Sequence, residues 1–173
     1  MAFASAKHRD QRRKDVCASP YINHPIQLVD VLANEAGVTD INVLQAAVLH
    51  DTIEDTDTTP EELQKEFNSQ ICSVVEEVTD DKGLSKEDRK RLQIENAHHK
   101  SLRARQIKLA DKICNIQDLA VSPPSDWSED RKIEYIRWSM DVINEIRGTN
   151  ADLENYFDNL CSETEQLVNP NVA

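Results

Sequence analysis

Apolar residues recur three or four positions apart along almost the whole chain, which is the spacing of one helix face. Ile26, Val29 and Leu32 show this pattern, and Ile136, Met140 and Ile143 repeat it much later. Alternating apolar and polar runs of the kind that predict strands are not evident, and the 173 residues include only three glycines. The sequence therefore predicts an all-α fold. The first expected helix is a basic one over about 2–15. Others are expected from 25 to 36, after 40, after 59, up to 78, from 85 to about 98 and from 105 to 119, followed by a long helix after 128 and a last amphipathic one after 150.

Several of these helices have recognisable end signals. Asp40, Ser128 and Asn150 each precede an apolar helical pattern and are good N-cap residues. Residues 59–62, Thr-Pro-Glu-Glu, combine a capping threonine, a proline at the first helical position and a glutamate at the third, which predicts a capping box. Gly37 follows an apolar stripe and is expected just beyond a helix end. These signals predict short connections and a compact helical bundle.

Length and composition narrow the class of protein. We expect one domain over 1–173, with a core of about 2–165 and a frayed tail after about 168. The formal net charge of −12 argues against nucleic-acid binding, which needs a basic surface. The amino-terminal residues lack the apolar centre of a signal peptide, no run is long enough to span a membrane, and the four cysteines are scattered as reduced packing thiols would be. A cytoplasmic protein is expected.

An acidic cluster interrupts the apolar pattern near residue 50. His50 and Asp51 end an apolar segment, and Glu54 and Asp55 follow within one turn. On one helix, side chains three or four positions apart share a face, so all four are expected to converge on one patch. Asp111 is a further carboxylate in an otherwise apolar helix. Burying such groups without a cation would be costly, so the pattern indicates a metal site.

The candidate metal ligands are His24, His50, Asp51 and Asp111, which come from three expected helices. Nitrogen and oxygen donors without sulfur suit Mn²⁺ or Fe²⁺ better than a structural zinc ion. Such a centre lowers the pKa of a bound water and polarises a phosphoryl group, so phosphate-ester hydrolysis is the expected chemistry. Singly, each residue has a structural explanation: a helix-start cap for His24, a buried hydrogen-bonded pair for His50 and Asp51, a salt bridge for Asp111. Their combination in this order is more specific.

The order His24, His50-Asp51, Asp111 resembles the metal set of the HD-domain phosphohydrolase superfamily. The motifs at 21–26, 49–56 and 108–112 resemble the hydrolase domain of the RelA/SpoT alarmone enzymes. The resemblance is greatest to the small alarmone hydrolases, the stand-alone members that include the metazoan SpoT homologue group. Residues 8–15, 78–82 and 127–128 also fit that group, and the match extends over roughly 2–160.

This resemblance implies an all-α HD-domain bundle with a Mn²⁺ site between helices and hydrolysis of guanosine tetraphosphate or pentaphosphate, (p)ppGpp. The reaction would be that of a 3′-pyrophosphohydrolase, giving GDP or GTP and pyrophosphate. By position in the motifs, the four candidate ligands would hold Mn²⁺, and Glu54 and Asp55 would be the catalytic carboxylates. The resemblance also implies a set of substrate-binding residues: Arg13, Lys14, Tyr21, Thr79, Asn115, Arg131 and Tyr135. For the last five, capping, surface polarity or helix packing is the alternative.

Three readings of the function remain open from the sequence. The second, after alarmone hydrolysis, is an NADPH 2′-phosphatase, because a 2′-phosphate beside adenosine resembles a 3′-pyrophosphate beside guanosine. The third is a non-catalytic HD module that senses or binds through its metal. Glu54 and Asp55 argue against this third reading, since a structural metal does not need two extra acids. A nucleotide is the expected partner, and assembly into a homo-oligomer is left open.

Overall fold

The structure is a computed structural model in which residues 1–169 are described. These residues form helices and loops with no strand, apart from one isolated bridge between Arg12 and Pro20, so the all-α prediction is confirmed. The helices are α1 (Ala2–Lys7), α2 (Asn23–Asp30) continued by the π-helical turn η1 (Val31–Glu35), α3 (Ile41–Leu49), α4 (Thr52–Asp55), α5 (Pro60–Glu66), α6 (Ser69–Val78), α7 (Lys86–Glu95), the 3₁₀ turn η2 (Ala97–His99), α8 (Leu102–Val121), α9 (Glu129–Asn144) and α10 (Ala151–Val168).

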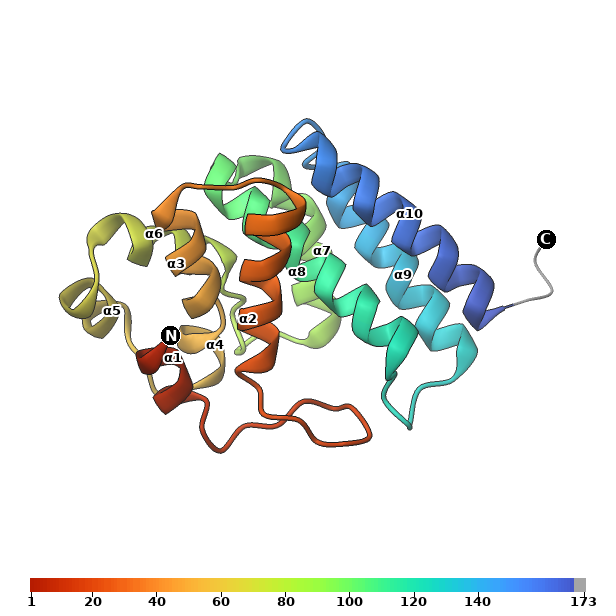
Figure 1. Cartoon of the computed structure of the whole chain (residues 1–173), viewed down its shortest axis with the longest axis horizontal. Coiled ribbons are helices and arrows are strands. Elements are labelled where there is room, and N and C mark those ends of the chain that lie inside the picture. Colours follow the sequence, from red (N-terminus) through yellow and green to blue (C-terminus); the bar gives the residue numbers. More distant parts are fainter. Residues whose placement is uncertain (170–173) are drawn as a thin grey trace.

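Helix α8 is the central element of the bundle. It runs between α2 on one side and the α9–α10 pair on the other (Figure 1), and it also contacts α3 and α6. Its apolar side chains are buried on several sides, with Ile107, Leu109, Ile113 and Ile116 fully inaccessible to solvent. The burial extends to polar positions between these residues, since Lys108 and Lys112 are buried, whereas Arg103 and Asp118 nearer the helix ends are partly exposed.

The predicted helix starts are confirmed at the atomic level. The side chains of Asp40, Thr59, Ser128 and Asn150 each accept a hydrogen bond from a main-chain N–H in the first turn of α3, α5, α9 and α10. Gly37 lies just after the turn that ends η1 and has a φ of +60°, which agrees with its predicted position just beyond a helix end. These signals were readable because a cap depends on only four neighbouring residues.

The capping box at the start of α5 is only half formed. Thr59 Oγ1 accepts from the Glu62 N–H at 3.2 Å, as predicted. The Glu62 carboxylate accepts from Lys7 Nζ at 2.9 Å and so ties α5 to α1, which lies 55 residues earlier in the chain. A long-range ion pair has here replaced the local bond that the motif would make.

The expected helix over 2–15 is wrong beyond Lys7. Residues after α1 form an irregular loop in which the Arg13 N–H donates to Ser19 O at 2.8 Å and the Tyr21 N–H donates to Gln11 O at 3.1 Å. The chain therefore folds back on itself, and Ala18 at the turn has a φ of 48°. The basic residues expected at the end of this helix, Arg9, Arg12, Arg13 and Lys14, lie on the loop instead. Main-chain hydrogen bonds to the residues that follow satisfy the backbone there without a helix.

The single helix expected to carry His50, Asp51, Glu54 and Asp55 is also wrong. Helix α3 ends at Leu49, and α4 starts at Thr52. At the break, Thr52 Oγ1 donates to Leu49 O at 2.7 Å and satisfies a carbonyl at the end of α3. His50 and Asp51 therefore lie in a turn between two helices, while Glu54 and Asp55 lie on α4.

The remaining global predictions have mixed outcomes. Cys17 is exposed, Cys72, Cys114 and Cys161 are buried, and all four are free thiols, as expected. None of the helices formed by residues 1–169 is long and apolar enough to cross a membrane. The buried apolar residues, Val142 excepted, form one cluster that extends from Ala4 to Cys161. The single domain and the cytoplasmic location stay predictions, and the tail expected after 168 lies, from 170 onward, outside the described residues.

Candidate active site

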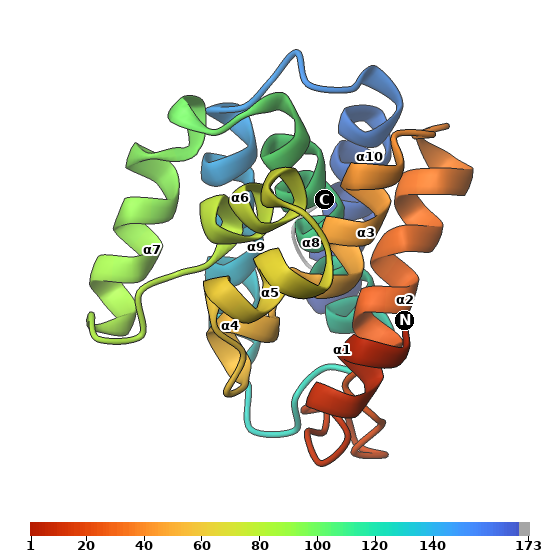
Figure 2. The same cartoon turned by 90° about the vertical axis from the view of Figure 1, so that its left-hand side faces the viewer.

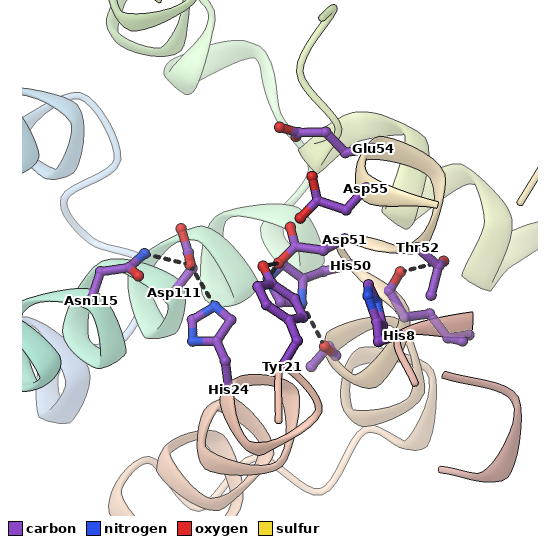
Figure 3. Close-up of polar contacts among 12 residues, drawn as sticks. His8, Tyr21, His24, His50, Asp51, Thr52, Glu54, Asp55, Asp111 and Asn115 are labelled. Carbon is purple, nitrogen blue, oxygen red and sulfur yellow. Dashed lines mark hydrogen bonds and ion pairs between the residues drawn. The ribbon is translucent and has the colours of Figure 1, made fainter. Parts of the chain in front are cut away.

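Three of the four predicted metal ligands meet at the centre of the molecule. His24 comes from α2, His50 from the turn after α3, and Asp111 from α8 (Figure 3). One ligand atom from each lies within 4.8 Å of those of the other two, and His24 Nε2 is 3.2 Å from Asp111 Oδ1. Both histidines are buried. Three segments far apart in the sequence thus form a group that could hold a metal ion.

The orientation of His50 fits a metal ligand. Its Nδ1 donates to Ala47 O at 2.9 Å, which directs Nε2 into the cluster. This Nε2 is 2.7 Å from Asp51 Oδ2. A cation bound here would replace the proton that Nε2 carries when His50 is charged, so the two atoms are placed as neighbouring ligands of one ion are. The donor chemistry of the site therefore fits a divalent metal.

The protonation states of the cluster are shifted by burial and by neighbouring charges. Burial lowers the pKa of His24, and the nearby Asp111 carboxylate only partly opposes this. Burial would also lower the pKa of His50, but the Asp51 carboxylate outweighs it and raises that pKa to about 9. Burial acts to raise the pKa of Asp111, whereas Lys112 and His24 hold it well below its usual value. The cluster therefore carries ionised carboxylates, which attract a cation.

Asp51, the fourth predicted ligand, lies beside the group of three. Its Oδ2 accepts a hydrogen bond from the Tyr21 hydroxyl and is also the atom near His50. Burial, together with the charge of Asp51, raises the pKa of Tyr21, so this phenol remains a donor. Tyr21 was predicted as a substrate residue, and the structure shows it holding a candidate metal ligand as well.

The two predicted catalytic carboxylates lie next to the cluster, on α4. Figure 3 shows Asp51, Asp55 and Glu54 in a row leading away from the histidines. Glu54 Oε2 accepts from the Asp80 N–H at 3.0 Å, and burial raises the pKa of its carboxyl group. Asp55 Oδ2 accepts from Gln11 Nε2 at 2.8 Å, and its Oδ1 is paired with Lys82. Both acids line the same cavity of about 170 Å³ as the cluster.

A second, larger cavity of about 440 Å³ adjoins the first. Tyr21, Asp55 and Asn115 line both cavities, so these three residues mark the junction. The second cavity also contains three more of the predicted substrate residues, Arg13, Lys14 and Tyr135. The structure thus places a cavity with three cations and two aromatic rings besides Tyr21 in its wall directly beside the carboxylate-rich one, although Asp118 in the same wall pairs with Arg13.

Two predicted substrate residues lie elsewhere. Arg131 lines a third cavity of about 260 Å³, with its guanidinium carbon 4.5 Å from the centre of the Trp127 ring. Thr79 follows α6, its hydroxyl donates to Val75 O at 2.8 Å, and it lines none of these three cavities. The structure therefore gives Thr79 a capping contact, and its role toward a substrate stays a prediction.

Sequence reasoning missed several residues that line the cavities. Lys108 and Lys112 on α8 are buried beside the cluster, and they carried the signal that had singled out Asp111, namely a charge in an apolar helix. Gln11 and Asp118 gave no such signal, because their contacts depend on how the loop before α2 folds: Gln11 bonds to Asp55, and Asp118 pairs with Arg13. The other missed lining residues include Asp80, Gln93 and Trp127.

Comparison with known proteins supports the resemblance. A family model described as HD domain matches residues 1–136. The human protein named guanosine-3′,5′-bis(diphosphate) 3′-pyrophosphohydrolase MESH1 is 55% identical over 152 residues, which are 88% of this chain and 85% of the human protein. The MESH1 of Drosophila melanogaster is 49% identical over 160 residues, 92% of this chain and 89% of that protein.

A solved structure gives the same result. The structure of a metazoan orthologue of SpoT that hydrolyses ppGpp matches with a TM-score of 0.91 and 49% identity, covering 94% of this chain and 91% of that one. The predicted resemblance to the metazoan SpoT homologue group is confirmed. The chain belongs to the HD-domain family and is a close homologue of the metazoan MESH1 proteins.

Proposed function

We propose that this chain is a Mn²⁺-dependent guanosine-3′,5′-bis(diphosphate) 3′-pyrophosphohydrolase, which converts (p)ppGpp to GDP or GTP and pyrophosphate. The observation that carries the proposal is the position of Glu54 and Asp55. Both line the cavity that contains the histidine and aspartate cluster, and Asp55 is at the junction with the second cavity. Relatives that are about half identical bear this activity in their names.

In this proposal His24, His50, Asp51 and Asp111 hold the metal. Two imidazole nitrogens and two carboxylates suit Mn²⁺, and the histidine that bonds to a main-chain carbonyl has its metal-binding nitrogen fixed in place. When bound, the ion lowers the pKa of a water molecule and neutralises charge on a phosphate. Tyr21 holds Asp51 in position through its hydroxyl group.

The carboxylates of α4 move the protons of the reaction. Water attacks the phosphorus attached to the 3′ oxygen, and the bond between this phosphorus and the 3′ oxygen breaks. One carboxylate takes the proton from the water, and the other assists protonation of the departing 3′ oxygen. The raised pKa of Glu54 brings that group closer to the range in which it can exchange protons.

The nucleoside and its 5′ phosphates occupy the second cavity. Arg13 and Lys14 supply positive charge there, and Asn115 and Tyr135 line the same cavity. A substrate with two diphosphate groups needs such charge in a chain whose net charge is −12. Arg131, in the neighbouring cavity, and Thr79 are assigned to the nucleotide only through the resemblance.

The test begins with protein stripped by a chelator and then given Mn²⁺, with products from ppGpp and from NADPH separated by ion-exchange chromatography. GDP and pyrophosphate, formed only with metal, are expected. Efficient release of phosphate from NADPH with little turnover of ppGpp would replace the proposal by the NADPH 2′-phosphatase. A protein that binds Mn²⁺ but turns over neither substrate would favour the metal-binding module.

The matched variant is Glu54→Gln, which keeps the shape of the side chain and removes its charge. We expect a loss of at least about 100-fold in turnover, the usual size of a general acid-base contribution. Manganese content, measured by elemental analysis, should stay at the wild-type level because Glu54 is not in the ligand set. A substantial rate remaining in this variant would exclude the role given to Glu54.

A further inference from the structure

Lys108 is a mostly buried cation in the site that pairs with no carboxylate of the described residues. It lies on α8, is only 6% exposed and lines the cavity that contains the cluster. Among residues 1–169, no carboxylate oxygen comes within 4.0 Å of its ammonium nitrogen, and this nitrogen is not one of the fully covered polar atoms, so it faces the cavity. A charge on a side chain that is mostly buried and has no oppositely charged partner is costly, so this position needs an explanation.

The neighbouring lysine shows what a structural solution looks like. Lys112, one turn further along α8, is 3% exposed, and its Nζ is 3.5 Å from Asp111 Oδ2 and 4.3 Å from the centre of the Trp138 ring. A carboxylate and an aromatic face thus both stabilise that charge. Lys108 lines the same cavity without either kind of partner, so its burial is not explained by the fold alone.

The electrostatic surroundings agree with this contrast. Burial lowers the pKa of Lys108, and the charge of Lys112 lowers it further. The carboxylates of Asp80, Asp111 and Glu54 oppose this at longer range. An anion bound within the cavity would stabilise the ammonium form that burial disfavours.

The position of Lys108 indicates which anion this is. Lys108 lines the first cavity and not the second, whereas Tyr21, Asp55 and Asn115 line both. If the nucleoside lies in the second cavity and the reacting phosphorus beside the cluster, the group that departs extends into the first. Because Nζ is more than 4.0 Å from every oxygen of Asp111, it does not pair with that candidate ligand and is left to bind an anion in the first cavity.

We propose that Lys108 binds the outer phosphate of the departing diphosphate, and so makes the site selective for a diphosphate over a monophosphate. The inference rests on the proposed function for the placement of the nucleoside. The ammonium group donates to oxygen atoms of the outer phosphate, a charge-assisted contact that a monophosphate in the same position cannot make.

The test uses the Mn²⁺-loaded full chain and two probes, inorganic pyrophosphate and inorganic phosphate, whose binding is measured by titration calorimetry. Lys108→Met keeps the length of the side chain and removes the charge. We expect it to weaken pyrophosphate binding about 10- to 100-fold and phosphate binding less than about 3-fold. Equal weakening of both, or of neither, would overturn the proposal.

Two controls separate this role from a structural one. Lys100→Met removes a lysine whose ammonium group donates to Glu77 O outside these cavities, and it should leave both affinities unchanged. Lys108→Met itself should keep its Mn²⁺ and unfold at the wild-type temperature or above, because an apolar side chain suits a buried position. Lys108→Gln serves as a second uncharged variant and should show the same selective loss.

The binding comparison does not require turnover. A wild-type protein that fails to hydrolyse ppGpp would refute the proposed function, and the affinities for pyrophosphate and phosphate would still test Lys108. A Lys108→Met protein that hydrolyses ppGpp with wild-type kcat and KM would refute the role of Lys108 and leave the proposed function standing.

Discussion

A chain of hydrogen bonds connects the amino-terminal segment to a predicted catalytic acid. His8 is 2% exposed, and its Nδ1 is 2.6 Å from Gln11 Oε1. With that nitrogen as the donor, the Gln11 amide is fixed so that its Nε2 donates to Asp55 Oδ2 at 2.8 Å. Tyr21 packs on the His8 ring, with 4.9 Å between the ring centres. Gln11 therefore acts as a positioning residue for Asp55.

Replacing Gln11 by Leu removes this contact at similar side-chain volume. A hydrogen bond to an ionised partner contributes about 1.5–3 kcal/mol. If this whole contribution stabilises the transition state, loss of the hydrogen bond lowers kcat by roughly 10- to 150-fold, since 1.4 kcal/mol corresponds to a factor of ten. Asp55 keeps its contact with Lys82, so it is misoriented rather than released, and we expect KM to change little.

The assay is the initial rate of ppGpp hydrolysis at saturating Mn²⁺, with the melting temperature of each variant measured beside it. His8→Ala should share most of the loss, whereas His8→Asn should recover part of it, because the asparagine amide can donate where Nδ1 did. A Gln11→Leu protein with wild-type kcat would refute the reasoning. A change confined to KM would show instead that Gln11 contacts the nucleotide.

Two further predictions concern metal binding and stability. Because the pKa of His50 in the metal-free protein is about 9, Mn²⁺ must displace the proton of His50 when it binds at pH 7.5. We expect release of close to one proton per ion, and an affinity for Mn²⁺ that falls up to about tenfold per pH unit below 9. Calorimetry in buffers of different ionisation enthalpy measures both. Binding without proton release would contradict this. Phe157 on α10 is fully buried, so Phe157→Ala should cost about 3–5 kcal/mol in urea unfolding, and a cost under about 1 kcal/mol would show that its surroundings collapse around the gap.

The parts of the fold that the sequence predicted are those that depend on near neighbours. The caps at Asp40, Ser128 and Asn150 and the apolar stripes needed only a few adjacent residues. The loop after α1 could not be predicted in this way, because its course depends on main-chain pairing between Gln11 and Tyr21, ten residues apart. The break before α4 depends on a single threonine hydroxyl, which the helical pattern does not reveal.

The site was predictable to the extent that its chemistry is unusual for its position. Histidine and aspartate in apolar helices attract attention because such residues are rarely buried without a partner. Lys108 satisfied the same criterion, but a lysine is ordinarily expected to extend from a helix into open solvent, and only the packing around α8 shows that this side chain is mostly buried and faces a cavity. The roles of the individual ligands and substrate residues stay predictions.

The central position of α8 links metal supply to the lifetime of the protein. Asp111 projects from the same helix whose apolar residues fill the core, so an ion held by Asp111 and the histidines of α2 and the α3–α4 turn would join three segments that must separate on unfolding. A ligand present at 1,000 times its dissociation constant adds about 4.1 kcal/mol to the free energy of unfolding. In a cell short of manganese, the proposed enzyme would therefore decline in amount through turnover of unfolded chains, as well as in activity.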